Sequence, residues 1–261
     1  MRKRSAPTRR FFCGLATAAA AAPFVAARSA RPVWAQTAAN QPVDLNLVLA
    51  VDVSGSVNQR RFELQRDGYA AAFRNPRVLK AVRGGGLQGA IAVTVVQWTG
   101  PALQVHVVPW TLIRDEASIS AFAAAIETAP RQLYSGGTSI SGAIDFGASL
   151  LARPPYAAMR RVIDISGDGA NNRGRPAVEA RDDAIAKGIT INGLPILELE
   201  PNLDEHYKNN VIGGPNAFMV IAQTFEEFAD AVLKKLVTEI ADDTTAPHPA
   251  ALPPEDRTLR C

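Results

Sequence analysis

A carboxylate and two hydroxyls follow a continuous apolar run near the start of the chain. The apolar residues 45–51 lead directly into Asp52, and Ser54 and Ser56 come next at alternate positions. Such a run is typical of a strand buried on both faces, as in the middle of a parallel sheet. Ligand sites on these sheets lie at the carboxyl ends of the strands. Because carboxylate and hydroxyl oxygens are hard ligands, the pattern suits Mg²⁺ or Mn²⁺.

Two later segments offer further oxygen ligands. Thr138 lies in a Gly-rich loop before a predicted helix, and Asp168 comes just after a second apolar strand. A simpler role exists for each residue, since Thr138 could cap that helix and Asp168 could occupy a turn. Ser54 and Ser56 could likewise cap a helix, although Asn58 is the more natural cap.

The three segments together, in this order, resemble the von Willebrand factor type A (vWA) superfamily. The motif is Asp-x-Ser-x-Ser after the first strand, followed by a Thr and an Asp from two later loops. Residues 139–146, 188–196 and 211–215 resemble in particular a bacterial vWA-like group of uncharacterised function. The third loop departs from the family's usual Thr-Asp-Gly, because this chain has Ser166-Gly167-Asp168-Gly169. Asp168 is the best match there, and Asp164 is a weaker substitute that lies inside the strand.

The resemblance implies a metal-ion-dependent adhesion site (MIDAS) for one divalent ion, Mg²⁺ or alternatively Mn²⁺ or Ca²⁺. The implied metal ligands are Asp52, Ser54, Ser56, Thr138 and Asp168, and the implied rim residues are Gly137 and Asn171. Mg²⁺ retains some of its waters, so one exchangeable position would face solvent. In the family, an Asp or Glu of a partner protein replaces that water. We therefore expect a metal-dependent protein-binding module.

The alternative is a Mg²⁺-dependent hydrolase of the phosphatase type. An Asp at the end of the first strand, beside Mg²⁺, also resembles the haloacid-dehalogenase-like phosphatases. Those enzymes need a second Asp two residues later as general acid, and this chain has Ser54 at that position. The three histidines are scattered without ligand or catalytic spacing, so the sequence favours a protein that is not an enzyme.

The alternation of strands and helices predicts one α/β domain over residues 42–241. We expect a doubly wound, mostly parallel sheet with one antiparallel edge strand and helices on both faces. The predicted strands cover residues 45–51, 90–98, 104–112, 161–165, 189–196 and 218–222. The predicted helices cover residues 58–73, 115–128, 138–151, 177–187 and 224–240.

The first 35 residues resemble an export signal, with basic residues followed by an Ala-rich apolar stretch. Thr8-Arg9-Arg10-Phe11-Phe12 resembles the twin-arginine signal, and an ordinary secretory signal with an incidental Arg pair is the alternative. The apolar stretch is shorter than the roughly 20 residues of a membrane span. We therefore expect a periplasmic or secreted protein with no stable membrane span after signal removal. The Pro-rich residues 242–261 are predicted to be a disordered tail.

Removal of the signal changes the charge of the chain. Seven of its 28 Lys and Arg residues lie in residues 1–35, which leaves 21 basic residues against 25 acidic ones, a formal net charge of −4. No basic patch remains to indicate a nucleic-acid partner. Cys13 would be lost with the signal, so Cys261 could not form an internal disulfide.

Overall fold

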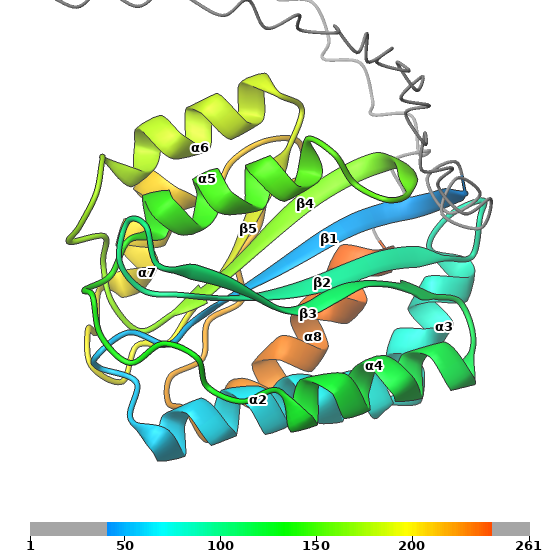
Figure 1. Cartoon of the computed structure of the whole chain (residues 1–261), viewed down its shortest axis with the longest axis horizontal. Helices are drawn as coiled ribbons and strands as arrows, with labels where there is room; N and C mark the ends of the chain where they lie inside the picture. The colour runs from blue at the N-terminus through cyan, green and yellow to red at the C-terminus, as the bar shows by residue number, and fades with distance from the viewer. Residues whose placement is uncertain (1–40, 242–261) are drawn as a thin grey trace, which may run out of the picture. The chain divides into compact units, whose positions relative to one another are not determined.

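A five-stranded sheet forms the centre of the computed structural model, which describes residues 41–241 (Figure 1). Its strands are β1 (Pro42–Asp52), β2 (Ile91–Trp98), β3 (Gln104–Ile113), β4 (Ala157–Gly167) and β5 (Thr190–Pro195). They lie in the order β3-β2-β1-β4-β5. Only the pair of β2 with the edge strand β3 is antiparallel among these neighbours. The predicted fold class is confirmed.

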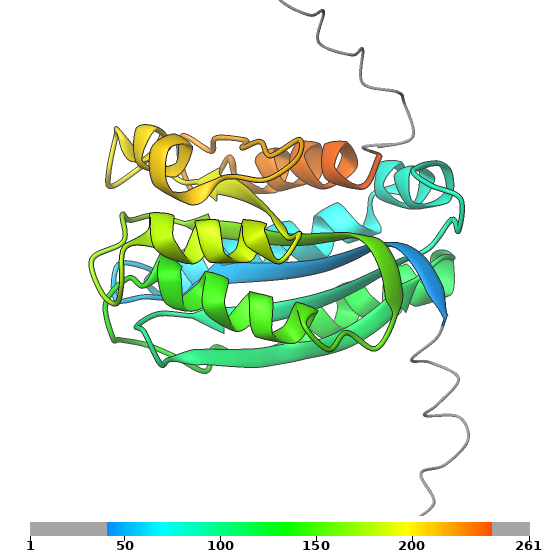
Figure 2. The ribbon, with the colours of Figure 1, turned by 90° about the horizontal axis from the view of Figure 1, so that it is seen from above.

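Helices cover both faces of this sheet (Figure 1). One face carries α2 (Gln59–Arg74), α3 (Pro76–Gly84), α4 (Glu116–Thr128) and α8 (Phe228–Ala241). The other face carries α5 (Ile140–Leu151), α6 (Ala177–Ala186) and the short α7 (Leu203–His206), which continues into a π-helix, η1 (Tyr207–Val211). Figure 2 shows α5 and α6 lying side by side over the sheet.

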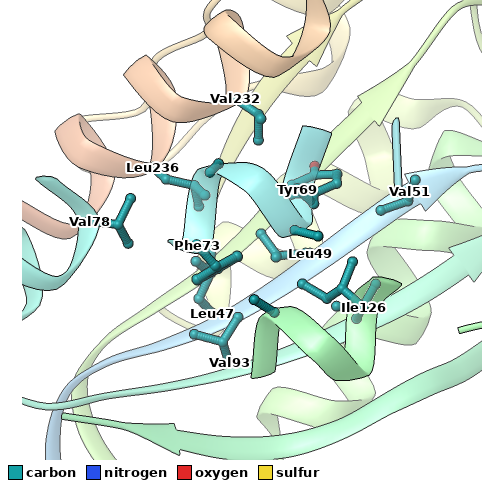
Figure 3. Packing of buried hydrophobic residues seen from close by; sticks show 14 of the residues in the cluster. Leu47, Leu49, Val51, Tyr69, Phe73, Val78, Val93, Ile126, Val232 and Leu236 are labelled. Atoms are coloured by element: carbon teal, nitrogen blue, oxygen red, sulfur yellow. The ribbon is translucent and has the colours of Figure 1, made fainter. Parts of the chain in front are cut away.

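Strand β1 is buried on both faces, as its continuous apolar run predicted. Successive side chains of a strand point to opposite faces, and the core follows this alternation. Leu47, Leu49 and Val51 pack against α2 and α8 (Figure 3). Val48 and Ala50 belong to the second cluster, under α5 and α6. The alternation places Asp52 on this second face.

The helices α2 and α5 are capped by residues that are not candidate metal ligands. Asn58 caps α2, as predicted, by accepting the backbone N–H of Arg61 at 3.0 Å. Ser139 caps α5 by accepting the N–H of Gly142 at 3.1 Å. The capping role that the sequence left open for Thr138 therefore belongs to its neighbour.

Two parts of the predicted element list are wrong. Residues 218–222 form no strand, because they touch β5 only through isolated bridges from Met219 to Gly193 and from Ala222 to Ile196. The prediction also missed α3, although Asn75 caps it and Pro76 occupies its first position, which is a standard start signal. The segment 201–215, for which no element was predicted, contains α7 and η1.

Two further predictions concern the ends of the chain. The predicted export signal and the predicted Pro-rich tail lie outside the described residues. Within residues 41–241, no helix is both long enough and apolar enough to cross a membrane.

Candidate metal centre

The candidate site lies at the carboxyl ends of β1 and β4, which are neighbours in the sheet. The chain passes from β1 to β2 on one side and later returns to β4 on the other side. This is the topological switch point at which open α/β sheets form a crevice for ligands. Asp52 is the last residue of β1, and Asp168 directly follows the last residue of β4.

Asp52 is fully buried and only half satisfied by hydrogen bonds. Its Oδ1 accepts the backbone N–H of Ser54 at 2.7 Å. Its backbone carbonyl accepts a bond of 3.1 Å from the amide of Gln65, which ties the end of β1 to α2. Its Oδ2 has no hydrogen-bond partner among the described residues. A buried oxygen without a partner is costly, by about 1–3 kcal/mol.

Ser54 and Ser56 connect Asp52 to Asp168. The Oγ atoms of Ser54 and Ser56 lie 3.1 Å apart, and the hydroxyl of Ser56 donates to Oδ1 of Asp168 at 2.7 Å. Asp168 is also buried, and its Oδ2 lacks a partner within the part of the chain that the structure describes. Each carboxylate therefore keeps one buried oxygen free.

The electrostatics of the two carboxyls fit a cation site. Burial, together with the negative charge of Asp168, raises the pKa of Asp52 to about 8, although hydrogen bonding by Ser54 opposes the shift. Burial also raises the pKa of Asp168, although the hydrogen bond from Ser56 opposes this shift. Two carboxyls whose ionised forms are disfavoured in one place are typical of functional sites. A divalent ion between them would supply both the opposite charge and the missing partners.

Thr138 reaches the site from the loop before α5. It is buried, its N–H donates to the side-chain oxygen of Asn172 at 3.0 Å, and its carbonyl accepts the N–H of Asn172 at 2.9 Å. Its Oγ1 lies 3.7 Å from the position that a Cβ on Gly169 would occupy. The hydroxyl thus lies against the loop that carries Asp168, at the same edge of the sheet as the other four predicted ligands.

The two predicted rim residues lie beside the site and shape its loops. Gly137 has a φ of 82°, and a Cβ there would lie 2.5 Å from Cγ of Arg173, so the position requires glycine. The side chain of Asn171 accepts the N–H of Ser141 at 3.1 Å and donates to the carbonyl of Arg175 at 3.1 Å. Contact of Gly137 or Asn171 with a ligand stays a prediction.

The structure separates Asp164, the weaker substitute, from this centre. Asp164 is fully buried inside β4 and faces α8, where Nζ of Lys235 lies 2.7 Å from its Oδ1. Residues 41–241 contain no group of three or more His, Cys, Asp or Glu side chains arranged to hold a metal ion. The candidate centre instead combines two carboxylates with hydroxyls.

Two arginines that the sequence did not single out hold the loop after β1. The guanidinium of Arg131 donates to the carbonyls of Val53 at 2.9 Å and Ser54 at 3.1 Å. Arg61 donates to the carbonyl of Ser56 at 2.9 Å. Arg131 lies far along the chain from this loop, so no local pattern announces its contact.

Comparison with solved structures defines the fold as that of a vWA domain. A von Willebrand factor type A structure from Catenulispora acidiphila is 20% identical over 76% of this chain and 43% of its own, with a TM-score of 0.53. Proximal thread matrix protein 1 from the mussel byssus, with a zinc-occupied MIDAS motif, is 15% identical over 76% of this chain and 46% of its own, with a TM-score of 0.54. The vWF domain of the type V pili tip protein Mfa5 from Porphyromonas gingivalis is 12% identical over 76% of this chain and 95% of its own, with a TM-score of 0.54.

These identities establish a shared fold only, and the chain spans less than half the length of the first two structures. No curated protein matches this chain. The chain belongs to the family described as "Protein of unknown function (DUF1194)", whose model matches residues 42–244.

Proposed function

We propose that residues 42–241 form a divalent-metal-dependent protein-binding module that acts outside the cytoplasm. One observation carries the proposal. Asp52 accepts the backbone N–H of Ser54, the Ser54 hydroxyl lies beside that of Ser56, and Ser56 donates to Asp168. Each carboxylate keeps a buried oxygen without a partner among the described residues. The ligand type suits Mg²⁺, with Mn²⁺ and Ca²⁺ as the other hard cations that take oxygen ligands.

The five candidate ligands would contact the ion in two ways. Asp52, Ser54, Ser56 and Thr138 would hold the ion, and Asp168 would reach it through a water. The bound ion would attract the carboxylate of an Asp or Glu from a partner protein. Ser56 is the candidate hydroxyl that remains partly exposed, while Asp52, Ser54, Thr138 and Asp168 are buried. The partner would therefore approach from the side of the loop that carries Ser56.

The identities of the similar proteins support this proposal. The mussel matrix protein carries zinc in its own MIDAS motif, and Mfa5 is a tip protein of pili. Both are proteins of extracellular structures. The predicted twin-arginine-like signal of this chain is consistent with the same location, and the partner would then be a periplasmic or extracellular protein.

The rival phosphatase function lacks the residue that it would need as general acid. At the position of the required general acid the chain has Ser54, whose hydroxyl lies 3.1 Å from that of Ser56. Hydrolysis of a generic phosphate ester by the full chain, dependent on both Mg²⁺ and Asp52, would replace the binding function with the enzymatic one.

The primary test is calorimetric titration of Mg²⁺, Mn²⁺ and Ca²⁺ into the full chain. Wild type and the control Asp67→Ala, which removes an exposed carboxylate on α2, should each bind one ion. Asp52→Ala should bind none while keeping the wild-type circular dichroism spectrum. Equal binding by Asp52→Ala and wild type would reject the metal centre.

A second test addresses the partner. Immobilised wild type and Asp52→Ala would be incubated with periplasmic extract, each with and without a chelator. A partner of the proposed kind should be retained only by wild type and only without chelator. Retention of the same protein by wild type and by Asp52→Ala, with and without chelator, would contradict metal-dependent binding.

A further inference from the structure

Tyr207 carries a buried hydroxyl that no contact within residues 41–241 explains. It is the first residue of the π-helix η1 and is fully buried. Its hydroxyl has no hydrogen-bond partner among the described residues. A buried tyrosine hydroxyl usually finds a partner, and an irregular turn such as a π-helix is frequent at functional sites.

Two glycines make room for this side chain. A Cβ on Gly193 of β5 would lie 2.6 Å from Cδ1 of the Tyr207 ring. A Cβ on Gly167 at the end of β4 would lie 3.1 Å from the Tyr207 hydroxyl. The ring therefore crosses β5 at one glycine and reaches the end of β4 at the other, and a larger residue at either position would displace it.

Gly167 also borders the candidate metal centre. Oδ2 of Asp52 lies 3.0 Å from the position of a Cβ on Gly167, and it is the oxygen that lacks a partner. Two buried oxygens without partners, Oδ2 of Asp52 and the hydroxyl of Tyr207, therefore both lie next to Gly167. Gly167 also stands where the vWA family's usual Thr-Asp-Gly motif has its Thr. Because glycine has no side chain, it leaves the space that the Tyr207 hydroxyl enters.

A purely structural role does not account for the hydroxyl. Phenylalanine would fill the same space without burying an unpaired polar group. Tyr69, which is equally buried, uses its hydroxyl as a donor to Oγ of Ser166 at 3.3 Å. A tyrosine phenol ordinarily has a pKa of about 10, so it carries its proton at neutral pH and can donate it.

We propose that Tyr207 is a positioning residue of the metal centre. Its hydroxyl donates to Oδ2 of Asp52 through one bridging water, and so orients the carboxylate toward the ion. This inference rests on the proposed function and extends that site to a residue on η1. Residues that orient metal ligands typically change metal affinity by about 10–100-fold when they are replaced.

The test compares Tyr207→Phe with wild type and with the matched control Tyr69→Phe, using Mn²⁺ calorimetry on the full chain. Tyr207→Phe should weaken Mn²⁺ binding about tenfold, and Tyr69→Phe should leave it unchanged. Urea unfolding in chelator should show Tyr207→Phe to be at least as stable as wild type. Equal Mn²⁺ affinity of Tyr207→Phe and wild type would overturn the inference.

A spectroscopic readout separates positioning from packing. Addition of Mg²⁺ should produce a near-ultraviolet tyrosine difference spectrum in wild type and in Tyr69→Phe, and Tyr207→Phe should lack it. The same spectrum in Tyr207→Phe would count against the inference. Gly193→Ala displaces the ring without altering any candidate ligand, so it should also weaken Mn²⁺ binding.

The outcomes distinguish this inference from the proposed function. If wild type binds no ion, the metal centre fails and the role of Tyr207 fails with it. If wild type binds an ion and Tyr207→Phe binds it equally well, the metal centre stands and only the positioning role is rejected.

Discussion

The hydroxyl of Ser56 donates a 2.7 Å hydrogen bond to Oδ1 of Asp168, which lies 112 residues later in the chain. This bond joins the loop after β1 to the loop after β4. Because the proton of Ser56 is directed at Asp168, one lone pair of the hydroxyl can accept from Ser54, 3.1 Å away, and the other is available to a cation. The bond thus arranges a carboxylate and a hydroxyl for the same ion.

Replacing Ser56 should weaken metal binding and leave the fold intact. Ser56→Ala removes one ligand and the bond that orients Asp168, so we expect a loss of about tenfold or more in Mn²⁺ affinity. Ser56 is partly exposed, so the domain should remain folded. Calorimetry would measure the change, with Ser149→Ala on α5 as the control. Unchanged affinity of Ser56→Ala would remove Ser56 from the ligand set.

Stability without metal should fall as the pH rises toward 8. The pKa of Asp52 is about 8 in the folded protein and ordinarily 3.8. Between these values the folded state holds a proton that the unfolded state releases, so raising the pH favours unfolding. The effect is absent below the ordinary pKa and complete above the folded one. Asp168 shifts in the same direction.

Urea unfolding in chelator at about pH 5 and about pH 8 would measure this dependence. His106 and His206, whose pKa values burial lowers, contribute in the opposite direction at the acidic end. Asp52→Asn isolates the carboxyl, because it should lose less stability between the two pH values than wild type. An identical pH dependence in both proteins would argue against the shifted carboxyl.

The buried ion pair of Lys235 with Asp164 should be essential to stability and irrelevant to metal binding. Glu239 is also fully buried, 3.5 Å from Lys235. Lys235→Met would leave two buried carboxylates without a cation, a loss of about 3–5 kcal/mol. Adding Asp164→Leu should restore only part of it, because one of the two uncompensated carboxylates is then absent and Glu239 remains.

Urea unfolding of these variants would measure the effect, with the exposed neighbour Lys234→Met as control. A loss below about 1 kcal/mol in Lys235→Met would show that the pair is dispensable. The folded fraction of Lys235→Met should bind Mn²⁺ with wild-type affinity, because Lys235 on α8 and Asp164 on β4 meet on the sheet face opposite Asp52.

Export should depend on the arginine pair near the start of the chain. Replacing Arg9 and Arg10 together with lysine should retain the full chain in the cytoplasm if the twin-arginine reading holds. The control, Arg2→Lys with Arg4→Lys, keeps the same charge and should still be exported. Cell fractionation would measure both. Continued export after the change at Arg9 and Arg10 would favour the ordinary secretory signal.

Much of the fold was predictable because its signals are local. The apolar run before Asp52 marks a strand with both faces buried, and Asn58 marks the start of α2. The predicted strand at 218–222 failed because a short apolar segment does not show whether its backbone will pair along its length. It bridges β5 only at Met219 and Ala222.

The sequence alone determined that a carboxylate and two hydroxyls follow a buried strand, and that Thr138 and Asp168 follow in loops at sheet ends. Tertiary structure decided that Asp168, and not Asp164, meets Asp52. A continuous apolar strand conceals which face each side chain takes, because both faces are buried. The meeting of Tyr207 with the centre was equally hidden, since it depends on how η1 packs across β5 and β4. Local patterns set the course of the backbone, and contacts between residues distant in sequence depend on how the elements pack together.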